Sequence, residues 1–240
     1  MTANNISASL REAVLKARQN FGNAICSLNV LRIEQTISSV QNNYNFVMKD
    51  PGSVPADGSI QIRLNDNDGF IAVASALNLK KFTTASPGSF PLFTFPDPSY
   101  FVGGTNTQAD ALESVYNGAL TFKTASTVRI DSISTNVMRY APDNQYKTPT
   151  SSAPVTPFTT PNYSPGRVMP SYGPDWERRG FVDLENYPVI DGSEQNVWNL
   201  QLGTATLTNV GTDVNMVLLI AGVLIKGAGA SAKRWGDWLN

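Results

Sequence analysis

The segment Met216–Ile225 constrains the fold more than any other part of the chain. It is apolar on both faces, yet it is far shorter than the roughly 20 residues that span a bilayer. A short run of this kind is typical of a strand that lies inside a sandwich of sheets or at an interface. The run therefore predicts a β-rich protein with no membrane span.

Two other segments alternate apolar and polar residues, which is the pattern of a half-buried strand. Their apolar residues are Ile60, Ile62 and Leu64 in one segment and Trp198, Leu200 and Leu202 in the other. The dipeptide Asp68-Gly69 follows the first segment and is a strong signal for a chain reversal. Short strands separated by turns therefore account for much of the chain.

Two segments have a helical pattern. The first begins near Ser7 and runs to Arg18, with one modest apolar stripe that includes Leu10 and Val14. This stripe predicts that the helix packs either on its own β-core or on a neighbouring subunit. The second predicted helix is Gln108–Asn117.

The composition agrees with this pattern. Charged residues make up 15% of the chain, against about 25% in a typical protein, and turn-forming polar residues replace them. We expect a mainly β protein built as an antiparallel β-sandwich, with a jelly roll as the favoured topology and two short helices. The expected organisation is an N-terminal helical arm over 1–28, one sandwich domain over 29–225 with a proline-rich loop at 142–174, and a tail over 226–240.

The absence of histidine is the strongest constraint on function. It excludes Ser-His-Asp and Cys-His catalysis, as well as zinc, copper and iron sites that need imidazole. The single cysteine, Cys26, cannot form an internal disulfide or a thiolate-only metal centre. We therefore predict no enzymatic activity, no catalytic residues, no metal and no cofactor.

Two acidic clusters invite a chemical interpretation. Residues 66–69 resemble a calcium loop, but Leu64 and Ser75 occupy positions where ligands are needed, so a turn is the better interpretation. Four carboxylates lie near Trp176, and a glycosidase needs two carboxylates placed across a sugar, where an aromatic side chain would help to bind it. These carboxylates are Asp175, Glu177, Asp183 and Glu185. Because arginines lie among them, we expect a salt-bridged surface loop instead.

Three segments carry the features of contact surfaces. The helical arm has an apolar stripe, residues 142–174 contain eight of the chain's 15 prolines, and the tail carries two tryptophans. A proline-rich segment loses little entropy when it becomes ordered, which suits an arm that clasps a neighbour. The candidate inter-subunit contacts are Leu10, Val14, Phe158, Tyr163, Tyr172, Trp235 and Trp238.

Taken together, these features resemble those of bacteriophage and small-virus virion structural proteins. The resemblance is carried by the N-terminal helix, the β-rich middle, the proline-rich loop, the absence of histidine and the apolar segment Met216–Ile225. It implies a jelly-roll capsid-like protein that assembles through loops and terminal arms. It also implies a place in the virion, after folding and assembly in the host cytoplasm.

The partners expected from this resemblance are other copies of the chain and further virion proteins. The formal net charge is −1 and no polybasic arm is present, so we expect no specific recognition of nucleic acid. The alternative is a carbohydrate- or receptor-binding sandwich of the adhesin or tail-fibre type. That alternative depends on the tyrosines and the tryptophan between Tyr163 and Trp176.

Overall fold

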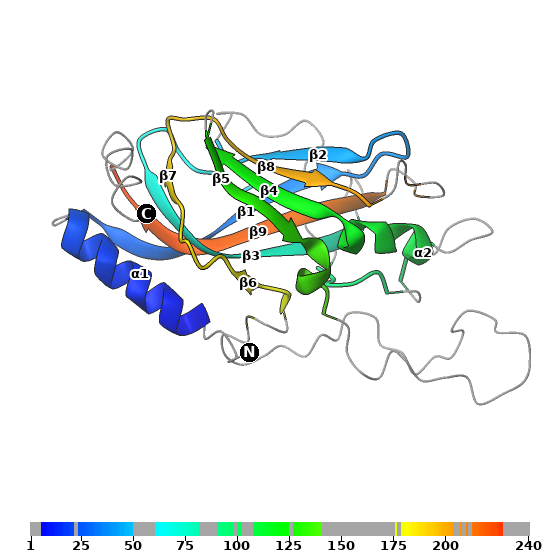
Figure 1. Ribbon diagram of the computed structural model, residues 1–240, viewed down its shortest axis with the longest axis horizontal. Coiled ribbons are helices and arrows are strands. Elements are labelled where there is room, and N and C mark those ends of the chain that lie inside the picture. Colours follow the sequence, from blue (N-terminus) through cyan, green and yellow to red (C-terminus); the bar gives the residue numbers. More distant parts are fainter. Residues whose placement is uncertain are drawn as a thin grey trace, which may run out of the picture.

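The computed structural model describes two β-sheets and the helices around them (Figure 1). The described residues are 6–21, 24–49, 61–81, 91–97, 100–101, 108–124, 127–140, 176, 179–203, 207, 210 and 213–227. Within them, the two sheets are antiparallel and pack against each other around a common apolar core. The predicted β-sandwich is confirmed.

Each sheet combines strands from distant parts of the chain. Sheet A has the order β1 (Cys26–Thr36), β9 (Val214–Ile225), β3 (Gly69–Lys81) and β6 (Val182–Asp183), and β7 (Val189–Asp191) also pairs with β3. Sheet B has the order β2 (Asn43–Val47), β8 (Asn196–Gln201), β4 (Ala119–Thr124) and β5 (Thr127–Ser134). The apolar run at 216–225 thus lies in β9, between two other strands, as its composition predicts.

The strand pairs are nested along the chain. β1 pairs with β9, β2 with β8, β3 with β6 and β7, and β4 with β5, so the chain forms one long antiparallel ribbon that closes between β4 and β5. The ribbon is also rolled, because β9 pairs with β3 and β8 pairs with β4. A ribbon rolled into two sheets in this way is a jelly roll, the topology that the sequence favoured.

The helix α1 (Ile6–Phe21) lies along the face of sheet A that points away from sheet B (Figure 1). Its side chains Leu10, Ala13 and Ala17 are buried there against β3 and β9. The second predicted helix begins as α2 (Gln108–Leu112) and continues as the 3₁₀ helix η1 (Glu113–Asn117). A second 3₁₀ helix, η2 (Thr135–Met138), follows β5.

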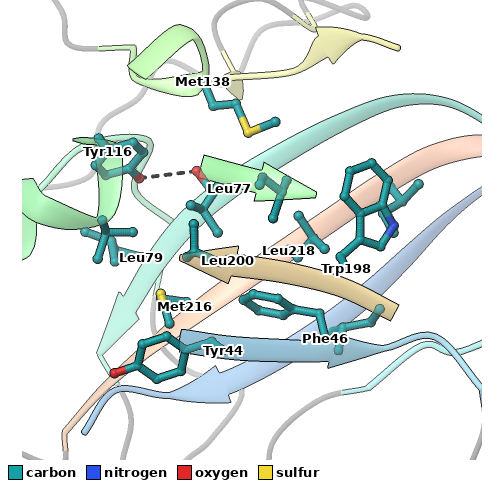
Figure 2. Packing of buried hydrophobic residues seen from close by; sticks show 14 of the residues in the cluster. Tyr44, Phe46, Leu77, Leu79, Tyr116, Met138, Trp198, Leu200, Met216 and Leu218 are labelled. Atoms are coloured by element: carbon teal, nitrogen blue, oxygen red, sulfur yellow. Dashed lines mark hydrogen bonds between the residues drawn. The ribbon is translucent and has the colours of Figure 1, made fainter. Parts of the chain in front are cut away.

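Side chains from both sheets fill the space between them (Figure 2). The alternation in β8 places Trp198 and Leu200 inside, where Trp198 stacks on Phe122 of β4 with ring centroids 4.7 Å apart. Met216 and Leu218 of β9 face them from sheet A. The interior of the sandwich is therefore packed with apolar side chains.

Tyr116 of η1 is a polar group inside this core. Its hydroxyl is fully buried and donates to the backbone carbonyls of Leu77 and Phe93, at 3.2 and 3.3 Å. Figure 2 shows the contact with Leu77. Burial raises the pKa of Tyr116 above its ordinary value, and the nearby Glu113 carboxylate adds to the increase. The folded protein therefore holds this proton more tightly than the unfolded chain does.

This difference predicts a specific loss of stability at alkaline pH. Above about pH 10 the unfolded chain releases the Tyr116 proton while the folded protein retains it, so the group lowers stability by about 1.4 kcal/mol per pH unit. We expect Tyr116→Phe to cost about 1 kcal/mol at neutral pH and to have a flatter stability profile above pH 10. Urea unfolding of both proteins across this range measures the difference, and parallel profiles would contradict it.

One strand prediction was wrong in the part that the structure describes. Residues 61–64 make only isolated bridges, in which Ile62 pairs with Arg32 and Leu64 with Lys49. Ile62 is 47% exposed whereas Leu64 is 1% exposed, so these two side chains do not share a buried face. The segment instead follows the edge of sheet A and then crosses toward β2. The division into arm, sandwich and tail stays a prediction, because residues 141–175 and 228–240 lie outside the described part.

Candidate assembly surfaces

The outer face of sheet B is a solvent-exposed surface built by strand alternation. In β2 and β8 every second side chain enters the core, and the residues between them point outward. The outward residues of the three adjoining strands are Asn43, Asn45 and Val47 of β2, Val197, Asn199 and Gln201 of β8, and Ala119, Thr121 and Lys123 of β4. Among these residues only Lys123 carries a charge. We call this surface the amide face.

The amides of this face are joined across the strands. The side-chain amide of Asn199 donates to Asn45 Oδ1 at 2.7 Å and also to Asn43 Oδ1. Asn43 in turn donates to Gln201 Oε1 at 3.1 Å. The strand register explains these contacts, because Asn45 lies directly opposite Asn199 and Asn43 lies opposite Gln201. Cross-strand hydrogen bonds therefore hold this surface in one arrangement.

The helix α1 is tied to sheet A by polar contacts at its start. Ser9 donates to Asp183 Oδ2 at 2.7 Å, and the indole N–H of Trp176 donates to Ser7 Oγ at 3.3 Å. The Trp176 ring also packs edge-on against Phe181, with centroids 5.0 Å apart. Trp176 thus helps to hold the helix, and its indole N–H is already used within the chain.

The structure places two of the candidate inter-subunit contacts. Leu10 is 4% exposed and Val14 packs beside it, and both face the chain's own sheet A. In this arrangement, the apolar stripe of the helix is used within the subunit. The other candidates, Phe158, Tyr163, Tyr172, Trp235 and Trp238, lie outside the described residues, so their role stays a prediction.

Of the four acidic residues around Trp176, the structure describes Asp183 and Glu185. Asp183 accepts hydrogen bonds from Ser9 and from the backbone N–H of Glu185, so its two oxygens hold α1 and a turn. Asp175 and Glu177 lie outside the described residues. The contacts of Asp183 therefore give no support to the glycosidase interpretation.

The turn at residues 66–69 is confirmed. The backbone N–H of Asp68 donates to the Asn65 carbonyl at 3.1 Å, and Asp68 Oδ1 accepts from the Gly227 N–H at 3.0 Å. No group of three or more acidic, thiol or imidazole side chains that could hold a metal ion is found among the described residues. Asp68 thus joins the turn to the end of β9.

A buried charge network lies where β1, β9 and β3 adjoin. Glu34 of β1 accepts from Lys80 Nζ of β3 at 2.6 Å, and both side chains are fully buried. Arg32 donates to the other carboxylate oxygen of Glu34, Oε1, at 2.6 Å. Asn215 of β9 lies between the two strands and donates to Oε2, the oxygen that Lys80 also contacts, at 3.1 Å. The network joins three strands of sheet A.

Sequence reasoning missed both polar arrangements. Asn199 and Gln201 were visible as the polar half of an alternating segment, but only the pairing of β2 with β8 brings their amides into contact with Asn43 and Asn45. Glu34 and Lys80 meet because both strands flank β9. A short-range pattern contains no information about such pairings.

Among the described residues, no helix is long and apolar enough to span a membrane. Comparison of the chain with protein-family models, with curated proteins and with solved structures finds no match.

Proposed function

We propose that this protein is a structural component of a bacteriophage or virus particle and that it self-assembles through its surfaces. The observation that carries the proposal is a jelly roll with an apolar interior and an amide face on β2, β8 and β4 that is held by cross-strand hydrogen bonds and carries one charge, Lys123. Viral capsid domains, lectins and cupins commonly use this fold. Fold analogy alone does not give function, so the choice among these classes depends on the residues.

The residues favour assembly over chemistry. Cupin-type metal chemistry uses histidine ligands within the sandwich, and this chain has no histidine. Its described interior is occupied by side chains such as Trp198, Phe122 and Phe46. Charge-poor exposed surface, by contrast, is inexpensive to bury because few ions lose their hydration. We therefore infer a protein that acts through contacts with other copies and with further virion proteins.

Self-assembly of the full chain tests this proposal. Sedimentation velocity and negative-stain microscopy of the purified protein should detect oligomers or particles whose fraction grows with concentration. The protein concentrations should reach about 1 mM, because at that concentration even an association free energy of about −4 kcal/mol gives a half-formed complex. A strictly monomeric protein over the whole series would contradict the proposed function.

A further inference from the structure

The amide face contains a donor and an acceptor that match each other. Asn199 uses its side-chain N–H groups on Asn43 and Asn45, and its own Oδ1 accepts no hydrogen bond from any residue that the structure describes. Asn45 accepts through Oδ1, and its Nδ2 donates to none of the described residues. An amide has both donors and acceptors, so each of these residues has hydrogen-bonding capacity left.

This arrangement is self-complementary. In a two-fold contact residue i of one copy meets residue j of the other, and j meets i. A two-fold copy of the amide face would place Asn45 Nδ2 against Asn199 Oδ1 twice, with the same donor and acceptor on each side. A charged face needs a partner of opposite charge, whereas a neutral amide face is complementary to itself. We propose that the amide face is a contact surface for a second copy of this chain.

The existing hydrogen bonds favour such a contact. Asn43, Asn45 and Asn199 are already held by each other, so they lose less side-chain entropy when they are buried. Among the outward residues of the face only Lys123, at its border, carries a charge that must be desolvated. The face is thus ordered before a partner arrives.

The edges of sheet B are less suited to pairing with another chain. The register between β4 and the edge strand β5 shifts between Leu120 and Phe122 and again at Lys123, and such irregularities disfavour extension of a sheet. On the opposite edge, the Asn45 carbonyl of β2 already accepts a hydrogen bond from the Gln35 side chain at 2.9 Å. The face of the sheet therefore offers the better contact.

The size of the face sets the expected strength. The three strands of the face, about 4.8 Å apart, and the five residues of β2, at about 3.4 Å each, give a projected area of roughly 250 Å². A stable specific interface buries about 800 Å² on each partner. The contact is thus weak by itself, and it gains strength where many copies are held together, as in a particle.

A sugar fits the face less well. Sugar-binding surfaces combine hydrogen bonds with aromatic rings that stack on the sugar, and none of the outward residues of the amide face is aromatic. The same polar groups would nevertheless serve a glycan. The experiment must therefore distinguish binding of a glycan from binding of a second copy of the chain.

The inference rests on the proposed function and is tested by charge substitution on the face. We expect Asn199→Lys to weaken self-association of the full chain by about tenfold or more, because two-fold symmetry brings like charges together. Asn20→Lys is the matched control, since Asn20 is an exposed residue of α1, which lies on the far side of sheet A from the face. Sedimentation velocity of both variants and the parent measures the effect, and thermal unfolding checks that each variant is folded.

A mixing experiment sharpens the test. Asn199→Lys and Asn199→Glu should each associate weakly alone and should associate more strongly when mixed. Parent-like association of Asn199→Lys would overturn this inference and leave self-assembly intact, whereas a monomeric parent would overturn the proposed function itself. Glycan-array binding that is lost in Asn199→Lys, with unchanged association, would assign the face to a sugar and overturn the contact.

Discussion

Glu34→Gln is expected to lower the free energy of unfolding by about 3–5 kcal/mol, one of the two largest effects that we predict. The substitution keeps the size of the side chain and removes the negative charge that lies 2.6 Å from Lys80 Nζ and from Arg32 Nη2. Lys80 is fully buried, so its ammonium would lose the carboxylate that compensates for its desolvation. Urea unfolding at neutral pH measures the loss.

The double variant Glu34→Gln/Lys80→Met distinguishes an ion pair from a simple packing effect. Removing both charges should recover more than about 1 kcal/mol of the loss caused by Glu34→Gln, because no buried ammonium remains. The exposed pair Glu12–Lys16 of α1 is the control, and Glu12→Gln should cost less than about 0.5 kcal/mol. Equal costs for Glu34→Gln and Glu12→Gln would show that the buried network does not stabilise sheet A.

Trp198→Ala should cost a similar amount, about 3–5 kcal/mol, because the side chain fills the centre of the sandwich. Trp198 is fully buried, stacks on Phe122 and packs among residues of both sheets (Figure 2). Its removal would leave a cavity that the two sheets cannot close without changing their spacing. Thermal and urea unfolding of the variant measure the cost.

Trp198→Phe provides the contrast. The indole N–H of Trp198 is buried and has no hydrogen-bond partner among the residues that the structure describes, so its loss removes an unsatisfied donor. We expect this variant to lose less than about 1.5 kcal/mol, since the smaller ring still occupies most of the site. A phenylalanine variant as unstable as the alanine variant would contradict this expectation and would mean that the full indole ring is needed to fill the site.

The jelly roll was predictable because its central elements have strong local patterns. β9 is apolar on both faces, and β8 alternates apolar and polar residues from Trp198 to Gln201. The sequence of each strand therefore predicts which of its side chains are buried. The N-terminal helix was also predictable from its spacing of apolar residues. These patterns require nothing from distant parts of the chain.

The functional surfaces were harder to predict because they depend on register. Asn45 and Asn199 come from strands far apart in the sequence, and a shift of one residue would point one of them into the core. Glu34 and Lys80 are charged residues that composition would place at the surface, and their burial follows from contacts across β9. The wrong prediction at residues 61–64 has the same origin, because alternation alone does not supply a neighbouring strand.

The nested pairing also has a consequence for synthesis of the protein on the ribosome. β9 is the last described strand along the chain, yet it is the strand that joins β1 to β3 in sheet A. An incomplete chain therefore lacks the centre of this sheet, and pairings between such distant segments form slowly. We expect the nascent chain to stay unable to close its sandwich until β9 has left the exit tunnel. Because the amide face needs a closed sandwich behind it, only chains whose β9 has already left the tunnel would then present an ordered surface for assembly.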